Sequence, residues 1–120
     1  MLEKNPIIHL KEVNKVFQVK SQDVWVLKNI NLEIYPGEFV VVFGPSGSGK
    51  STILHVMLGL EPPTRGDAEI LGLQIYQKGE NELCDYRKKF VGIIYQQPNW
   101  VKSLSVLENV AFPLVMQGMK

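Results

Sequence analysis

The sequence has little cysteine and no long apolar run, and both absences exclude certain classes of protein. Cys84 is the single cysteine, so neither an internal disulfide nor a cysteine cluster for zinc is expected. No apolar stretch approaches the roughly 20 residues that a membrane-spanning helix requires. These features are typical of a reducing, cytosolic compartment, and any membrane-spanning part of an assembly would then belong to another chain.

An excess of charge of either sign is also absent. Lysine and arginine number 13 and aspartate and glutamate 12, which leaves a net charge of +1. This balance does not favour a nucleic-acid surface, so no nucleic-acid partner is expected. With 120 residues, of which 45% are hydrophobic, the chain is expected to form one domain at most.

The most informative segment is rich in glycine and runs from Gly44 to Thr52. Its sequence satisfies G-x-x-x-x-G-K-[ST], the pattern of a phosphate-binding loop. Backbone N–H groups of such a loop and of the following helix contact the phosphates of ATP or GTP. Lys50 would place its charge on the β- and γ-phosphates, and the Ser51 hydroxyl would bind Mg²⁺. The predicted nucleotide-binding residues of the loop are Gly44, Pro45, Ser46, Gly47, Ser48, Gly49, Lys50, Ser51 and Thr52.

The residues around this loop predict a strand, the loop and a helix in that order. Residues 39–43 form a continuous apolar run, which is typical of a parallel strand buried on both faces. Residues 50–60 predict a helix that Gly59 and the two following prolines terminate. Ser105 and Glu108 form a capping-box pattern, although Pro113 disfavours the second half of the helix that they begin. Further strands are expected over 7–19, 24–34, 68–71, 73–76 and 91–95, and further helices over 81–89 and 105–116.

Several segments together resemble the N-terminal half of an ABC transporter ATPase subunit. Besides the loop, these are residues 27–34, residues 91–96, which are similar to the glutamine loop of that family, and residues 107–110. Within the family the chain is most similar to the ATPases of the lipoprotein-releasing and macrolide-export type. The resemblance implies an α/β fold, a P-loop NTPase core with an N-terminal antiparallel β subdomain, truncated before the helical signature region. Residues 1–120 would form a partial nucleotide-binding domain.

The resemblance also implies roles for two residues outside the loop. Phe17 matches the aromatic residue that stacks on adenine, although packing within the sheet is the alternative, and Trp25 is a weaker candidate. Gln96 matches the glutamine that contacts Mg²⁺ and the attacking water and that senses the membrane partner. The implied cofactors are ATP and Mg²⁺, and Lys50 and Gln96 would be the catalytic residues.

The same resemblance implies partners and a location. The partners are separate transmembrane permease subunits and a second nucleotide-binding domain in a head-to-tail dimer. The implied location is cytoplasmic, peripheral on the cytoplasmic face of the inner or plasma membrane.

The groups that this family uses for hydrolysis are not found among the 120 residues. None of Asp23, Asp67 and Asp85 follows four apolar residues, as the Mg²⁺-binding aspartate should. No Gly-Gly pair is available for a Leu-Ser-Gly-Gly-Gln signature, and the two histidines lie in the wrong segments. We therefore expect these residues to bind Mg-ATP without hydrolysing it alone, and we expect the strand at 39–43 to lack its parallel neighbours.

Two alternatives to a transporter ATPase remain open at this point. Small P-loop nucleotide kinases share the loop, but they place it after a first strand, whereas 43 residues precede Gly44 here. Residues 61–80 also contain only Arg65 where those kinases carry several arginines. The second alternative is a non-catalytic nucleotide-binding or regulatory fragment that uses half of the fold.

Overall fold

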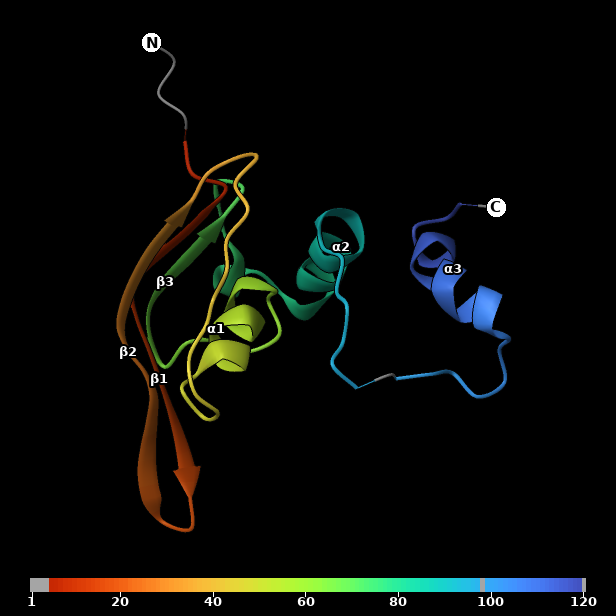
Figure 1. Ribbon diagram of the computed structural model, residues 1–120. Helices are drawn as coiled ribbons and strands as arrows, with labels where there is room; N and C mark the ends of the chain where they lie inside the picture. The colour runs from red at the N-terminus through yellow and green to blue at the C-terminus, as the bar shows by residue number, and fades with distance from the viewer. Residues whose placement is uncertain (1–4, 98, 120) are drawn as a thin grey trace. The chain divides into compact units, whose positions relative to one another are not determined.

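A computed structural model describes residues 5–97 and 99–119. The chain divides into two compact units, with the boundary between Gly79 and Glu80. The first unit contains a sheet and a helix, and the second contains two helices joined by a long loop (Figure 1).

The first unit is built on a four-stranded antiparallel sheet. Its strands are β1 (Ile8–Val19), β2 (Gln22–Ile34), β3 (Arg65–Ile70) and β4 (Leu73–Gln74), in the order β2-β1-β3-β4. The predicted antiparallel β subdomain is therefore confirmed. The strand expected over 73–76 is shorter than predicted, because a 3-10 helix, η1 (Ile75–Gln77), begins after Gln74.

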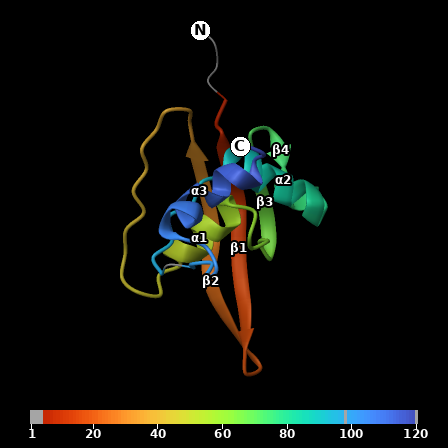
Figure 2. The ribbon, with the colours of Figure 1, turned by 90° about the vertical axis from the view of Figure 1, so that its right-hand side faces the viewer.

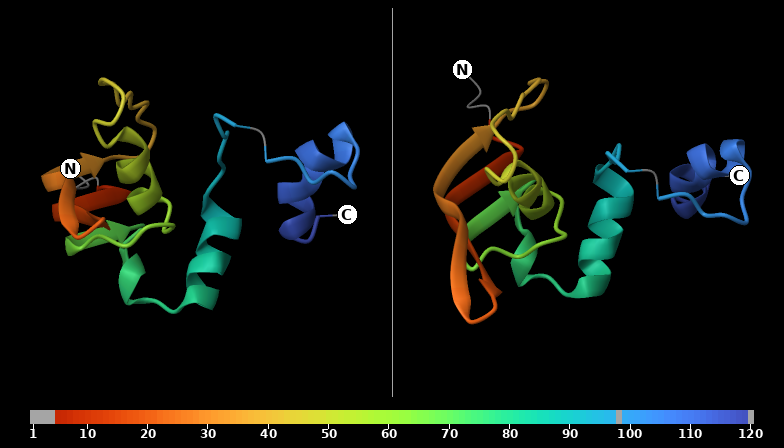
Figure 3. Two further views of the ribbon diagram at one scale, coloured as in Figure 1. Left: turned by 90° about the horizontal axis from the view of Figure 1, so that it is seen from below. Right: turned by 60° about the horizontal axis from the view of Figure 1, so that its bottom comes forward.

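Helix α1 (Lys50–Met57) lies against one face of this sheet, as the left view of Figure 3 shows. Val56 and Met57 are its buried residues, at 0% and 7% exposure. Apolar side chains of the strands supply the other side of this core, namely Leu10, Val13, Leu27, Ala68 and Ile70. The apolar pattern of the helix thus fixes how its N-terminal end, which follows the glycine-rich loop, is held on the sheet.

A β-bulge in β1 changes which residues face the core. Leu10 and Val13 are both fully buried although three positions separate them, so the period of two is interrupted between them. Glu12 takes φ +49° at this point, and its N–H donates to the Asn31 side chain at 2.9 Å. After the bulge the alternation resumes from Val13, and Lys15 therefore turns inward with it.

The strand predicted over 39–43 is not formed, and this prediction is wrong for the described structure. The segment between β2 and α1 is a long loop (Figure 2), and Phe39 and Phe43 are 93% and 90% exposed. A strand that is apolar on both faces needs neighbours on both edges, and within residues 5–97 and 99–119 no strand pairs with this one. Residues 39–43 thus have the composition of a central strand, but no strand of the described residues pairs with them.

The second unit contains α2 (Glu80–Phe90) and α3 (Val106–Met116). The predicted capping box is confirmed, because the Ser105 hydroxyl accepts from the Glu108 N–H and the Glu108 carboxylate accepts from the Ser105 N–H. Pro113 lies inside α3 without ending it, so the expected interruption is not seen. Residues 91–95 are coil rather than strand, for the same reason as residues 39–43.

None of these helices could span a bilayer: within the described part of the chain, no helix combines the necessary length and hydropathy.

Candidate functional site

The loop that precedes α1 takes a conformation that depends on its glycines. Gly47 and Gly49 have φ of +77° and +96°, values that disfavour a side chain. A Cβ on Gly49 would also lie 2.9 Å from the carbonyl oxygen of Val26. Gly44 has no positive φ, but a Cβ there would meet the Ser48 hydroxyl at 2.8 Å. The glycines therefore allow the loop to lie close to itself and to β2.

The first turn of α1 presents free backbone donors at the end of this loop. The first bond within the helix runs from the Ile53 N–H to the Gly49 carbonyl at 3.0 Å, and no side chain caps Gly49. The N–H groups from Gly49 to Thr52 therefore have no acceptor within the helix. Together with the positive end of the helix dipole, they form a site for an anion.

The ammonium of Lys50 is folded back onto the loop. Its Nζ donates to the carbonyl oxygens of Gly44 at 2.8 Å and Pro45 at 2.7 Å, and it lies 3.4 Å from the Ser48 hydroxyl. The charge is thus held inside the curve of the loop rather than extended into solvent. Ser51 follows in the first turn of α1 and is exposed, so its hydroxyl is accessible to a cation that accompanies an anion on the loop.

Phe17 lies on β1 opposite Val24 and is half-buried. The ammonium of Lys15 lies over the Phe17 ring, with Nζ 4.9 Å from the ring centroid. Lys15 is 8% exposed, and sequence reasoning did not single it out. The available signal was the alternation Val13, Lys15, Phe17, which places a lysine between two apolar residues on one side of a strand.

Gln96 lies in an exposed coil of the second unit, whereas the loop 44–52 and Phe17 belong to the first. The roles predicted for Gln96 toward Mg²⁺ and water therefore stay predictions. Trp25, the weaker stacking candidate, is 47% exposed on β2.

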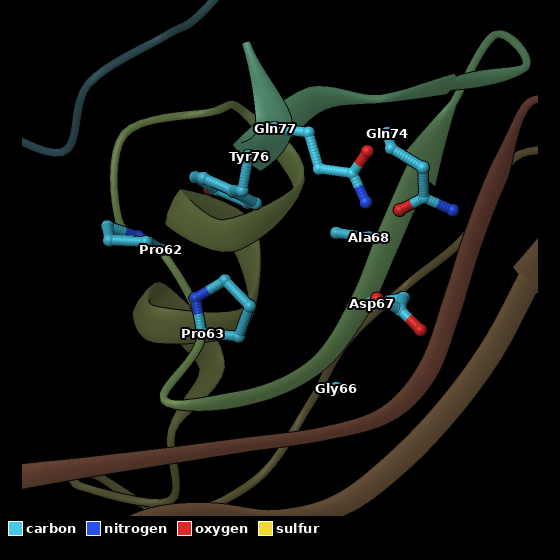
Figure 4. Close-up of a pocket in the computed structure, with 8 residues that line it drawn as sticks. All are labelled: Pro62, Pro63, Gly66, Asp67, Ala68, Gln74, Tyr76 and Gln77. Carbon is cyan, nitrogen blue, oxygen red and sulfur yellow. The ribbon is translucent and has the colours of Figure 1, made fainter. Parts of the chain in front are cut away.

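A cavity of about 290 Å³ lies between the connector that joins α1 to β3 (residues 58–64) and the strands β3 and β4 (Figure 4). Pro62 and Pro63 line one side and Gln74 and Gln77 another, and no residue of the loop 44–52 is among its lining residues. Of the described residues that line it, only Asp67 is charged. The cavity therefore lacks the convergent donors that the loop and α1 provide.

Comparison with known proteins agrees with this geometry. A family profile described as ABC transporter matches residues 27–120, which include the loop and α1. The chain belongs to the ABC transporter family. The relatives include proteins of the lipoprotein-releasing and macrolide-export type, as the resemblance in the sequence implied.

Curated relatives match almost the whole chain. An uncharacterised ABC transporter ATP-binding protein of Methanocaldococcus jannaschii is 40% identical over 111 residues, which are 92% of this chain and 47% of the relative. The lipoprotein-releasing system ATP-binding protein LolD of Pseudoalteromonas translucida is 38% identical over 94% of this chain and 49% of its own length. The chain therefore spans about half the length of these relatives. The macrolide export ATP-binding/permease protein MacB of Hahella chejuensis is 38% identical over 96% of this chain and 18% of its own length.

Solved structures share the fold. One ATP-binding cassette, described as a dimer in a post-hydrolysis state bound to ADP and Pi, superposes with a TM-score of 0.88 at 39% identity. The match covers 92% of this chain and 47% of that one. The α/β fold class with its N-terminal antiparallel sheet is thus confirmed, and the family match favours the transporter ATPase over the small kinase.

Proposed function

We propose that this chain is the nucleotide-binding part of an ABC transporter ATP-binding subunit and that it holds Mg-ATP on the loop 44–52. The observation that carries the proposal is the pairing of an uncapped helix N-terminus with the Lys50 ammonium at one loop. Free N–H donors and a fixed cation are what a triphosphate requires. Lys50 and the loop amides would hold the phosphates, and Phe17 would stack on adenine.

Mg²⁺ would be bound by the Ser51 hydroxyl, since Mg²⁺ takes few protein ligands and completes its shell with phosphate oxygens and water. Gln96 would join this site in the assembled protein. The metal would neutralise the phosphate charge and orient the terminal phosphate when bound.

The partners that we propose are membrane permease subunits and a second nucleotide-binding domain. The support is that a relative is named an ATP-binding/permease protein and that a similar cassette is described as dimeric. Such an assembly would place the chain on the cytoplasmic face of a membrane and would couple nucleotide binding to transport.

The magnesium role of Ser51 can be measured by metal dependence. In the presence of Mg²⁺, the variant Ser51→Ala is expected to bind ATP about tenfold more weakly, because a ligand to a charged group contributes about 1.5 kcal/mol. With EDTA the variant and the wild-type chain are expected to bind ATP equally. Isothermal titration in both buffers measures this, and Ser51→Thr, which keeps a hydroxyl, should retain the Mg²⁺ effect. Equal loss with and without Mg²⁺ would contradict the metal role.

We further propose that these 120 residues bind ATP without hydrolysing it alone. A missing general base typically costs a factor of ~10²–10⁴ in rate, and a missing charge-stabilising contact costs a comparable factor again. We expect steady-state phosphate release far below about 1 s⁻¹, the low end for phosphoryl-transfer enzymes. Turnover near that rate, lost in Lys50→Ala, would refute the proposal.

A further inference from the structure

Lys15 is a buried charge for which stability gives no sufficient reason. Its residue is 8% exposed, and it lies on β1 between Val13 and Phe17. Its Nζ donates to the Pro62 carbonyl at 2.7 Å and forms an ion pair with the Glu61 carboxylate. Replacement of a whole buried ion pair by apolar residues is often neutral or stabilising, so the pair of Lys15 with Glu61, which is one-third exposed, is weak evidence for a role in stability. The charge therefore calls for another explanation.

The ammonium covers one face of the Phe17 ring, with 4.9 Å between Nζ and the ring centroid. A cation at this distance is attracted by the negative π face and restricts the ring to one orientation. It also draws π density toward itself, which makes the opposite face less negative. Two π faces repel when both are electron-rich, so this polarisation favours stacking of a purine on the opposite face.

The partners of Lys15 connect this ring to the helix that carries the phosphate loop. Glu61 and Pro62 belong to the connector that follows α1, and the Glu61 N–H donates to the His55 carbonyl of that helix at 3.3 Å. Three residues further on, the Thr64 N–H donates to Asn14 at 2.8 Å and its hydroxyl accepts from the Val16 N–H at 3.0 Å. The connector is thus hydrogen-bonded to β1 at the residues before and after Lys15. The Lys15 side chain contacts both the connector and the Phe17 ring.

From this arrangement we propose that Lys15 is a positioning residue for the base: it holds the Phe17 ring from beneath so that the outer face receives the purine of the nucleotide. The inference rests on the proposed function, since it concerns the base end of the same nucleotide. It assigns no contact between Lys15 and the nucleotide itself.

The test separates the base from the phosphates. Binding of ATP and of inorganic tripolyphosphate, which has no base, is measured by titration calorimetry on the full chain. Lys15→Met keeps the length of the side chain and removes the charge. We expect this variant to bind ATP roughly tenfold more weakly, within the range that loss of one base stack produces, and to bind tripolyphosphate as the wild type does.

Three further variants make the result specific. Lys15→Arg keeps a cation over the ring and is expected to retain wild-type ATP affinity. Phe17→Ala should show the same selective loss, and adding Lys15→Met to it should cause no further loss. Glu61→Gln removes the ion pair of Lys15 but keeps the lysine, and it should show a smaller selective loss of ATP affinity. This variant replaces Lys15→Met in the test if Lys15→Met does not fold.

The possible failures are distinguishable. Equal weakening of ATP and tripolyphosphate in Lys15→Met and Glu61→Gln would show a structural role only and would overturn the inference. Unchanged ATP affinity in both variants would overturn it as well while leaving the phosphate site intact. If the wild-type chain binds neither ligand, the proposed function fails and the inference fails with it.

Discussion

Replacement of Lys50 by alanine is expected to weaken Mg-ATP binding by about 10- to 100-fold, because a hydrogen bond to a charged group contributes about 1.5–3 kcal/mol. The ammonium is already placed within the loop by the carbonyls of Gly44 and Pro45, so little ordering of the side chain is needed when phosphate arrives. Removal of the charge leaves the amides of α1 as the remaining donors. Titration of wild type and variant with Mg-ATP and with tripolyphosphate should show the same loss for both ligands.

The control for this experiment is Lys11→Ala. Lys11 is exposed on β1, next to the fully buried Leu10. The substitution therefore removes one positive charge without changing the loop. It should leave both affinities within about twofold, because a lone exposed charge contributes little at physiological salt. If Lys50→Ala bound both ligands as tightly as Lys11→Ala does, the phosphates would not be held by this loop. Unfolding curves of both variants check that the fold is retained.

The conformation of the loop 44–52 was predictable because its determinants are local. Nine consecutive residues specify a conformation that depends on short-range sterics, such as the positive φ of Gly47 and Gly49. The capping box of α3 is equally local, since Ser105 and Glu108 are one helical turn apart. The long strands β1 and β2 were found because alternation of apolar residues extends over many positions.

The segment at 39–43 shows where local reasoning ends. Its apolar run has the composition of a buried parallel strand, but strand formation depends on neighbours that are distant in the sequence. The chain spans 47% of the Methanocaldococcus jannaschii relative that it matches, and in the described residues these five positions stay coil. Composition expresses the preference of a segment, whereas pairing partners decide whether the preference is realised.

Lys15 could not be interpreted from its own position either. The alternation places it on the core side of β1, but its partner carbonyl on Pro62 is 47 residues further along the chain. The bulge at Glu12 also shifts the register of β1 against β2, and no sequence pattern announced it. The role of Lys15 depends on its contacts with the connector and with the Phe17 ring, and these contacts can be recognised only in the folded structure.

Gly66 on β3 lies against the bulge of β1, and its replacement by alanine is expected to have a large effect on stability. A Cβ there would lie 2.3 Å from the Glu12 carbonyl oxygen, and the residue has φ +92°. The carbonyl cannot move away easily, because it accepts from the Asn14 side chain at 2.8 Å. Gly66→Ala therefore combines backbone strain with a clash against backbone, and we expect it to lower the free energy of unfolding by about 3 kcal/mol.

Gly72→Ala separates these two contributions. Gly72 also has a positive φ, +75°, but a Cβ there would have no atom within 4 Å. This variant should cost only the conformational strain, about 1 kcal/mol. Urea unfolding followed by circular dichroism gives both values from the midpoints at unchanged slope. A loss in Gly66→Ala no larger than that in Gly72→Ala would mean that β3 and the bulge of β1 are not in close contact. The larger loss would instead show that glycine is needed at position 66 because β3 lies directly beside the bulge of β1. This contact is two residues beyond Thr64, which is hydrogen-bonded to β1 at Asn14 and Val16, on either side of Lys15.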